Sequence, residues 1–253
     1  MKNENTKIEI RECSTLEEFR DCAKLQKEVF GLPDIEVSPV RHLIVTKSAG
    51  GFVLGAFDGE NLIGFVLSVP GFDAGERFFY SHMTAVSQKY QNGGIGAKLK
   101  WTQRDFSLAR NVNFIKWTFQ PVLARNANFN LNRLGATIKK YLPNFYGTDY
   151  PNLSAQTAKI GLDSDRLYCN WDLNSEKVIA LSNSENFAET GEIALKIEIP
   201  NDWNLLVKSD LKKAQAEQER IKNEFQTAFA ENLICRAFER SETNPKYVLF
   251  KND

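Results

Sequence analysis

Three glycines within four positions constrain the fold of this chain more than any other feature. The segment Gln91–Ala97 reads Gln-Asn-Gly-Gly-Ile-Gly-Ala and lies between a strand-like stretch and a helix-like stretch. Glycine has no Cβ, so the backbone here can curl tightly and approach a ligand. The helix that follows offers unpaired N–H groups and the positive end of its dipole, which suit a pyrophosphate. The turn therefore predicts an anion site, with a purely structural glycine turn as the alternative.

The spacing of these glycines excludes two common nucleotide-binding motifs. It is not G-x-G-x-x-G, and no Lys-Ser or Lys-Thr pair follows as in a P-loop. The predicted apolar face of the following helix consists of Ile95, Leu99, Phe106 and Ala109. The basic side chains predicted to lie largely outside that face are Lys98, Lys100, Arg104 and Arg110.

Hydrophobic periodicity predicts an alternation of helices and strands through residue 173. Strands are predicted at 8–11, 52–57, 62–69, 77–86, 114–119, 136–142 and 167–173, the third ending at Pro70-Gly71. Helices are predicted after the capping box Ser14–Glu17, at 39–46, after Gly96 and at 126–134. The order β-α-α-β-β-β-α-β-α-β-β fits neither a hairpin barrel nor a repeated Rossmann array.

The pattern changes after Asn174. A linker-like stretch at 182–186 precedes a strand at 195–199, a helix and a terminal hairpin, which together form a βαββ piece. The helix is predicted from the stripe Leu211, Ala214, Ile221, Phe225 and Ala228. About seventy-five residues are few for an independent domain. We therefore expect a domain of residues 1–174 and an extension of residues 175–253 that docks on it.

Composition excludes several classes of function. Lys plus Arg and Asp plus Glu number 32 each, so no overall charge favours nucleic acid or an anionic membrane. No apolar run approaches the ~20 residues of a membrane span, and the polar N-terminus does not resemble a signal peptide. The four cysteines are scattered and there are two histidines, so we expect free thiols and no metal site. These features predict a cytoplasmic protein without nucleic-acid or membrane partners.

Two segments resemble the hallmarks of the GNAT superfamily of acetyltransferases. Gln91, Gly94 and Gly96 occupy the three defining positions of its acyl-CoA turn, Arg/Gln-x-x-Gly-x-Gly/Ala. Arg133–Ala136 resembles the Lys/Arg-Leu-Gly-Phe/Ala that ends the next helix of the family. The resemblance covers residues 7–173 and looks like an uncharacterised subfamily with its own C-terminal extension. It implies an α/β fold with a mixed, mostly antiparallel central sheet flanked by helices.

The resemblance also implies a co-substrate and its contacts. An acyl-CoA, with acetyl-CoA as the expected donor, would pass its acyl group directly to a small amine. The residues implied to contact the coenzyme are Thr84, Ala85, Val86, Gln91, Asn92, Gly93, Gly94, Ile95, Gly96 and Ala97. We add Asn126, because asparagine is a poor helix former and near a helix start it caps the helix or reaches a ligand. A homodimer is left open.

Direct transfer needs a base for the amine and a proton for the leaving thiolate. His82 is the candidate base, because it flanks the implied acyl site and titrates near neutral pH. A core histidine bonded within the sheet is the alternative. The tyrosine that many family members use as an acid corresponds to Leu131, which has no proton to donate. Tyr141 and Tyr146 are the remaining candidates for the acid.

Three functions follow from these residues. The first is an acyl-CoA-dependent N-acyltransferase acting on a small amine. The second is a non-catalytic acyl-CoA-binding protein with an interaction module, which Leu131 favours. A nucleic-acid-binding module has the least support, because the helix after Gly96 carries only a modest basic strip. Asp165 and Arg166 either overhang the acceptor pocket or form an internal ion pair, and Gln88 replaces the usual proline of the family.

Overall fold

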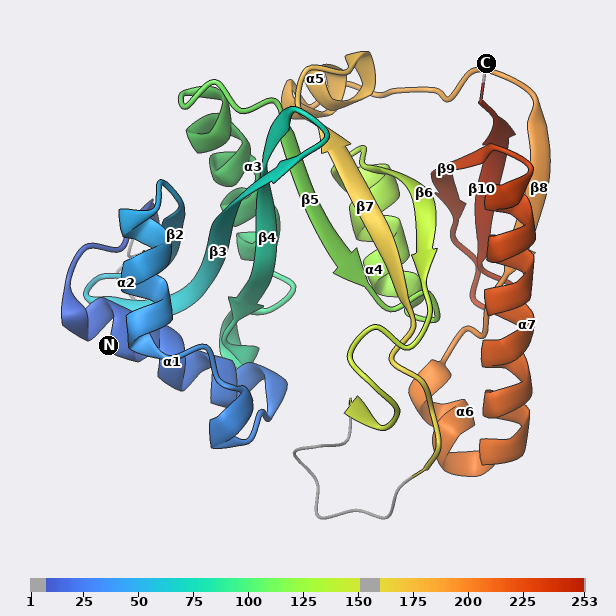
Figure 1. The fold of residues 1–253 in the computed structure, drawn as a ribbon, viewed down its shortest axis with the longest axis horizontal. Helices are drawn as coiled ribbons and strands as arrows, with labels where there is room; N and C mark the ends of the chain where they lie inside the picture. The colour runs from blue at the N-terminus through green and yellow to red at the C-terminus, as the bar shows by residue number, and fades with distance from the viewer. Residues whose placement is uncertain (1–7, 151–159, 253) are drawn as a thin grey trace, which may run out of the picture. The chain divides into compact units, whose positions relative to one another are not determined.

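The computed structural model describes residues 8–150 and 160–252 (Figure 1). The chain divides into two compact units, Met1–Lys116 and Trp117–Asp253. Through residue 172 the helices and strands follow the predicted order. In the described part of the chain, no helix is both long and apolar enough to cross a membrane.

The first unit is built around antiparallel strands. Its strands are β1 (Glu9–Glu12), β2 (Phe52–Asp58), β3 (Asn61–Asp73), β4 (Glu76–Val86) and the start of β5 (Phe114–Phe119). Its helices are α1 (Leu16–Phe30), α2 (Val40–Ser48) and α3 (Ile95–Leu108), with the short turns η1 (Asp34–Glu36) and η2 (Gln88–Tyr90). β1 to β4 are successive antiparallel neighbours, and β5 runs parallel to β4. The sheet is therefore mainly antiparallel.

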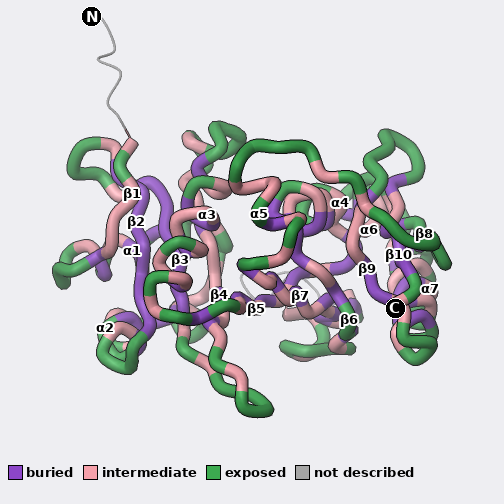
Figure 2. Tube along the Cα trace, turned by 90° about the horizontal axis from the view of Figure 1, so that it is seen from above, coloured by how far each residue is buried: buried purple, intermediate pink, exposed green. Residues whose placement is uncertain are grey.

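The two faces of this sheet pack against different helices. Val53 and Phe57 of β2 belong to a hydrophobic cluster with residues of α1 and α2. Phe52, which directly precedes Val53 in β2, contacts Phe106 of α3 instead, with ring centroids 5.6 Å apart. Because side chains alternate along a strand, α1 and α2 cover one face and α3 covers the other. Figure 2 shows that β2 and the middle of β3 are buried.

Helix α1 begins one residue later than the predicted capping box. Thr15, rather than Ser14, is the N-cap residue, and Glu18 closes the box by accepting from the Thr15 backbone N–H at 3.0 Å. Glu18 also forms an ion pair with Arg11 at 2.6 Å. The ion pair with Arg11 stabilises Glu18 in this position and so favours a helix that begins after Thr15.

The sequence predicted that the third strand ends at Pro70 and Gly71, and this prediction is wrong. β3 continues to Asp73, and Pro70 lies opposite Phe79 of β4. The pairing of β3 with β2 has already ended at Ser68. Beyond that point β3 needs a partner on only one side, so a residue without an N–H is tolerated.

The second unit contains the end of β5 and the elements that follow it. Its further strands are β6 (Thr137–Leu142), β7 (Arg166–Asp172), β8 (Ile193–Glu198), β9 (Leu233–Glu239) and β10 (Lys246–Lys251). Its helices are α4 (Ala124–Asn128), which continues as the π-helix η3 (Phe129–Arg133), α5 (Glu176–Ser182), α6 (Trp203–Ser209) and α7 (Leu211–Ala230). The strands follow the order β7-β6-β9-β10-β8.

Residues of the C-terminal extension pair directly with residues that precede position 174. Ile138 of β6 is in register with Cys235 of β9. Asn132 donates to the Phe238 carbonyl at 2.7 Å and accepts from the Phe238 N–H at 3.0 Å. The extension therefore adds strands to the sheet of the second unit. The division into domains of 1–174 and 175–253 stays a prediction.

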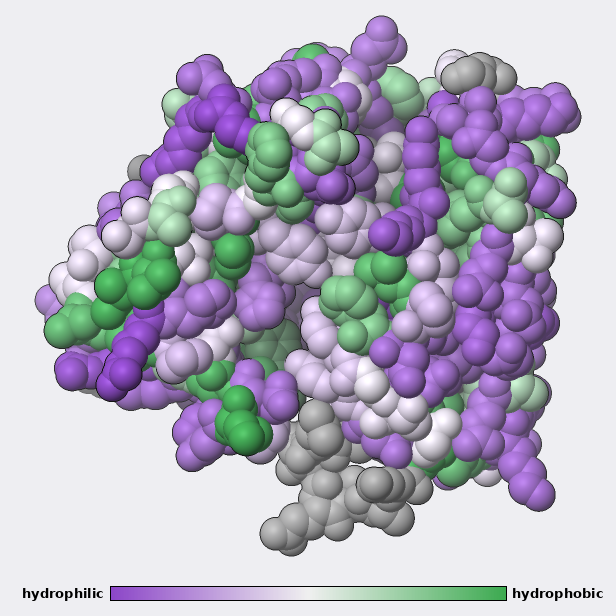
Figure 3. All heavy atoms as spheres, in the orientation of Figure 1, coloured by the Kyte–Doolittle hydropathy of each residue, from purple (hydrophilic) through white to green (hydrophobic). Residues whose placement is uncertain are grey.

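Helix α7 covers this part of the sheet with an amphipathic surface. Its buried residues are Ala214, Ile221, Phe225 and Ala228, four of the five residues of the predicted stripe. The outer surface over α7 is hydrophilic (Figure 3). Two short helices, α5 and α6, were not predicted, so the piece from β8 onward is βααββ rather than βαββ. Each has seven residues, too few for a clear helical period.

Candidate active site in the first unit

A β-bulge at His82 interrupts strand β4. Leu67 of β3 pairs with Met83 and the next residue, Ser68, pairs with Ser81, so His82 is the extra residue of β4. A bulge reverses the alternation of side chains along a strand. Ser81 accordingly bonds to α3, whereas Met83, two positions later, packs in the cluster of α1 and α2. Bulges occur preferentially beside active sites, where they redirect a side chain.

The side chain of His82 lies among residues of α1, α2 and the loop between these helices. Its Nε2 is 3.3 Å from the Ser38 hydroxyl, and its ring meets the His42 ring edge-on at a centroid distance of 6.1 Å. His82 keeps a large accessible surface, so it is not a closed core histidine. Desolvation by the surrounding atoms, and then the proximity of His42, lower its pKa below the usual value. The ring is therefore held in the neutral form at pH 7.

Gln26 fixes the segment that presents Ser38. Its buried side-chain amide accepts from the Ser38 N–H at 2.8 Å and donates to the Ser38 carbonyl at 3.2 Å. The Ser38 hydroxyl is thus held beside His82 by a residue of α1. Sequence reasoning missed both residues, because Ser38 is 44 positions from His82 and Gln26 is 12 positions from Ser38. No sequence motif connects them.

The glycine turn opens the N-terminus of α3 toward solvent. Asn92 and Gly94 have φ angles of +66° and +79°, and no side-chain hydrogen bond caps the helix at Gly94. A Cβ built on Gly94 would meet nothing within 4 Å. Gln91 donates to the Val86 carbonyl at 3.0 Å, which ties the turn to the end of β4. Backbone N–H groups at a helix start with such space around them can bind an anion.

The implied contacts of the coenzyme occupy one continuous stretch. Thr84, Ala85 and Val86 end strand β4, two to four residues after the bulge. Ala85 is buried in the cluster of α1 and α2, and Thr84 and Val86 are half-buried. Strand β4 is followed along the chain by η2 and then by α3. The structure thus brings His82, these three residues and the turn together in the first unit.

Lys100 corrects the predicted outline of helix α3. It was expected outside the apolar face, yet its side chain is only 3% exposed. Its ammonium group donates to Ser81 at 3.0 Å and to Gln103 at 2.7 Å. The sheet-facing surface of α3 is therefore partly polar, which the apolar periodicity did not indicate. Ala109, expected on the buried face, is exposed just after the helix ends.

Three further candidates lie in the second unit. Asn126 is exposed near the start of α4, where its side chain is available to a ligand, although Leu123 is the N-cap residue. Tyr141 is buried and donates to Asp165 at 2.9 Å, and burial followed by Asp165 raises its pKa well above the usual value. Tyr146 is exposed beside Phe145, with ring centroids 4.7 Å apart.

The structure also places Leu131 and Asp165, two residues considered for the implied acceptor side. Leu131, at the position of the usual acid, is fully buried in the π-helix η3. Asp165 accepts from Tyr141 and from the Asn144 N–H at 2.8 Å, which are both uncharged donors. The described residues include no group of three or more side chains placed to hold a metal ion.

Comparison with known families assigns a segment of the chain to one of them. Residues 14–134 match the model of the acetyltransferase (GNAT) family, a segment that includes the bulge, the glycine turn and α3. The matched segment is a GNAT acetyltransferase domain. This match supports a GNAT-type N-acetyltransferase. No curated protein sequence matched the chain.

Solved GNAT structures share its fold. A putative GNAT acetyltransferase from Desulfovibrio desulfuricans is 13% identical with a TM-score of 0.53, covering 66% of this chain and 99% of that one. The ribosomal-protein-S18-alanine N-acetyltransferase of Escherichia coli is 13% identical with a TM-score of 0.51, covering 67% and 97%. A chain of the NatC complex bound to Gag peptide and CoA is 16% identical with a TM-score of 0.52, covering 66% of this chain and 99% of that one. These matches confirm the predicted GNAT-like α/β fold with its mainly antiparallel sheet.

Proposed function

We propose that this GNAT protein transfers an acyl group, with acetyl as the expected one, from coenzyme A directly to a small amine. The observation that carries the proposal is the β-bulge at His82, which turns an accessible, neutral imidazole out of β4. The strand then leads within a few residues to the open turn before α3. A base and an anion site thus follow one another along a single segment.

The turn fits the pyrophosphate of coenzyme A. Gly94 adopts a left-handed φ with free space where a Cβ would lie, and the first N–H groups of α3 have no side-chain cap. We assign the pyrophosphate to the backbone amides of residues 92–97 and the pantetheine arm to the backbone of Thr84–Val86. When bound, the coenzyme supplies the acyl group as a thioester. Asn126 is proposed as a further contact.

His82 is proposed as the base that accepts the proton of the attacking amine. A base must be unprotonated to act, and the lowered pKa keeps the ring neutral at pH 7. The Ser38 hydroxyl, 3.3 Å from Nε2, orients the ring through the backbone clamp of Gln26. Tyr141 and Tyr146 stay proposals for the group that protonates the thiolate. Of these, Tyr146 is the exposed one.

The second candidate function is a non-catalytic acyl-CoA-binding protein. Leu131 favours it, because a fully buried leucine stands where many family members place the acid. The extension would then serve as an interaction module. This candidate shares the coenzyme site and differs only in chemistry.

Two measurements test these candidates. Calorimetry with coenzyme A measures the site common to both, and thiol release from acetyl-CoA across a panel of small primary amines measures transfer. Binding with amine-dependent thiol release supports the transferase. Binding without release from any amine supports the binding protein, and the absence of binding refutes both. The variant Glu242→Gln changes the net charge at an exposed position of the loop between β9 and β10 and should behave as the wild type in both measurements.

A further inference from the structure

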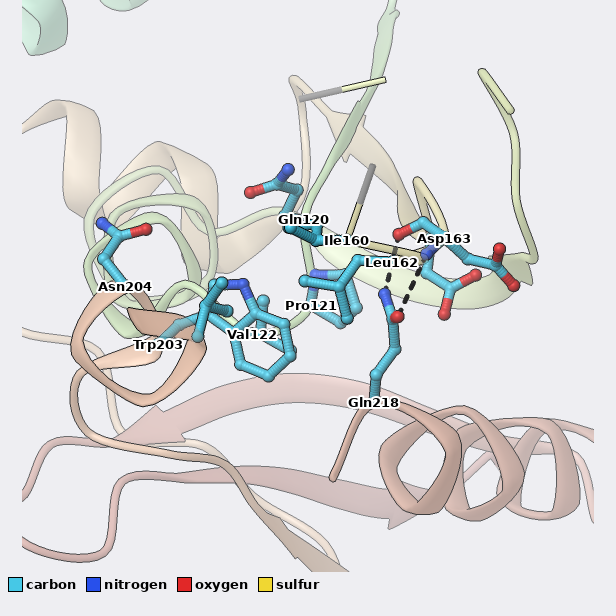
Figure 4. Close-up of a pocket in the computed structure, with 11 residues that line it drawn as sticks. Gln120, Pro121, Val122, Ile160, Leu162, Asp163, Trp203, Asn204 and Gln218 are labelled. Carbon is cyan, nitrogen blue, oxygen red and sulfur yellow. Dashed lines mark hydrogen bonds between the residues drawn. The ribbon is translucent and has the colours of Figure 1, made fainter. Parts of the chain in front are cut away.

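A cavity of about 100 Å³ lies wholly within the second unit (Figure 4). Four segments line it: the turn after β5, the stretch before β7, and helices α6 and α7. Its apolar lining residues are Pro121, Val122, Ile160, Leu162, Trp203 and Val207. The polar part consists of Gln120, Asp163, Asp165, Asn204 and Gln218. The cavity thus has an apolar wall and an acidic wall.

Hydrogen bonds hold this lining in place. Gln218 accepts from the Asp163 N–H at 3.1 Å and donates to the Asp163 carbonyl at 2.7 Å, as the dashed lines of Figure 4 show. Tyr247 donates to the Pro121 carbonyl at 2.7 Å and so fixes the turn after β5. Pockets that bind small molecules are usually preformed, with a few fixed polar groups in a mostly apolar lining. This cavity has that construction.

The hydrogen-bond donors to the two aspartates of the acidic wall, among the residues that the structure describes, are neutral groups. Asp165 is only 2% exposed, and its hydrogen-bond partners, Tyr141 and the Asn144 N–H, are neutral. Asp163 accepts from the hydroxyl of Thr148. Lys222 contributes at longer range, but Glu219 is its ion-pair partner and the first cause of its raised pKa. A buried carboxylate is expected to have a cationic partner.

We propose that this cavity binds a small primary ammonium ion with a short, branched apolar body. The ammonium group would lie at Asp163 and Asp165, and the apolar body against Val122 and Trp203. A cavity of about 150 Å³ accommodates benzene, so about 100 Å³ suits roughly four non-hydrogen atoms. The site lies outside the segment that matches the GNAT model, apart from the turn after β5. It is tested by binding alone, so its outcome does not depend on the proposed transfer.

Isopropylamine and isopropanol are matched probes for the full-length protein. They have the same shape and size, and they differ in the charged group at pH 7. The indole N–H resonance of Trp203, assigned by its absence in Trp203→Phe, reports occupancy in a proton–nitrogen correlation spectrum. We expect isopropylamine to shift this resonance saturably in the millimolar range, and isopropanol to bind at least tenfold more weakly. Equal affinity of the two probes, or no shift with either, would overturn the proposal.

Two variants separate charge from location. Asp165→Asn keeps the shape of the wall and removes its buried charge, so the preference for the amine should fall at least tenfold. Glu242→Gln changes the net charge equally at an exposed position that does not line the cavity and should leave binding unchanged. Val207→Phe narrows the cavity from α6 without altering charge and should weaken both probes. If Asp165→Asn does not fold, the paired probes and Val207→Phe still decide. Unchanged amine affinity in either folded cavity variant refutes the site.

Discussion

Replacing Gly94 with glutamate tests whether the turn before α3 binds pyrophosphate. At φ +79° any residue with a Cβ costs about 1–2 kcal/mol of fold stability, and no atom within 4 Å adds a clash. Two unit charges 4 Å apart repel by about 4 kcal/mol at an effective dielectric of 20 and by about 1 kcal/mol in bulk water. The turn is exposed, so we expect a loss between these limits. Coenzyme A should bind roughly ten- to hundredfold more weakly.

Calorimetry on three variants isolates the charge. Gly94→Ala carries the backbone cost alone, Gly94→Gln adds the bulk of the longer side chain, and Gly94→Glu adds its charge. The affinity should fall in that order, with the largest step between Gln and Glu, and that step should shrink as salt screens the repulsion. Thermal melts should show the three variants similarly stable. Equal affinities of the Gln and Glu variants would refute binding of the pyrophosphate at this turn.

Three further predictions concern other parts of the molecule. His82→Gln should lower kcat/KM by roughly 10²–10⁴. The wild-type rate should rise with pH through a pKa below the usual histidine value, an inflection that the variant lacks; an unaltered pH profile would contradict the role. Asn132→Ala removes both hydrogen bonds to Phe238 and should cost about 2–3 kcal/mol in urea unfolding, whereas Asn126→Ala, at an exposed position, should cost little. Truncation after Asn174 removes the strand that pairs with β6 and should cause aggregation, which a monomeric, equally stable fragment in size-exclusion chromatography would disprove.

The pH dependence of stability follows from the same histidine with a definite sign. The native state holds the proton of His82 less tightly than the unfolded chain does, because its pKa is lowered. Between the native and the unfolded pKa the unfolded state binds more protons, so acidification favours unfolding. The contribution of His82 to stability is therefore complete above the unfolded pKa and falls as the pH decreases below it.

The parts of the site that depend on local sequence were predictable. The turn Gln91–Ala97 was located because glycines and an amphipathic helix start are local features. Strand β5 has the predicted bounds, 114–119, because its alternation of buried and half-buried residues is regular. The order of helices and strands followed from the same periodicities.

The surroundings of His82 were not predictable, for a physical reason. Residues 78–86 combine apolar and small polar side chains, so their pattern fits more than one alternation and does not reveal the bulge. Ser38 and Gln26 reach the site only through tertiary packing of α1 and the following loop. Lys100 was placed outside the buried face because a buried lysine depends on polar partners elsewhere in the chain. Sequence periodicity contains no information about such partners.

The bulge also separates the role of His82 from the packing of β4. Ser81 lies on the side of α3, whereas Met83 and Ala85 lie on the side of α1 and α2, and one extra residue produces this change. Deleting His82 would make Ser81 and Met83 consecutive residues of a regular strand, which lie on opposite faces, so Ser81, Met83 and Ala85 would each keep their present helix layer. Such a deletion should therefore remove the imidazole while leaving the pairing of β3 with β4 intact. The extra residue serves the candidate site, and the packing of the sheet does not require it.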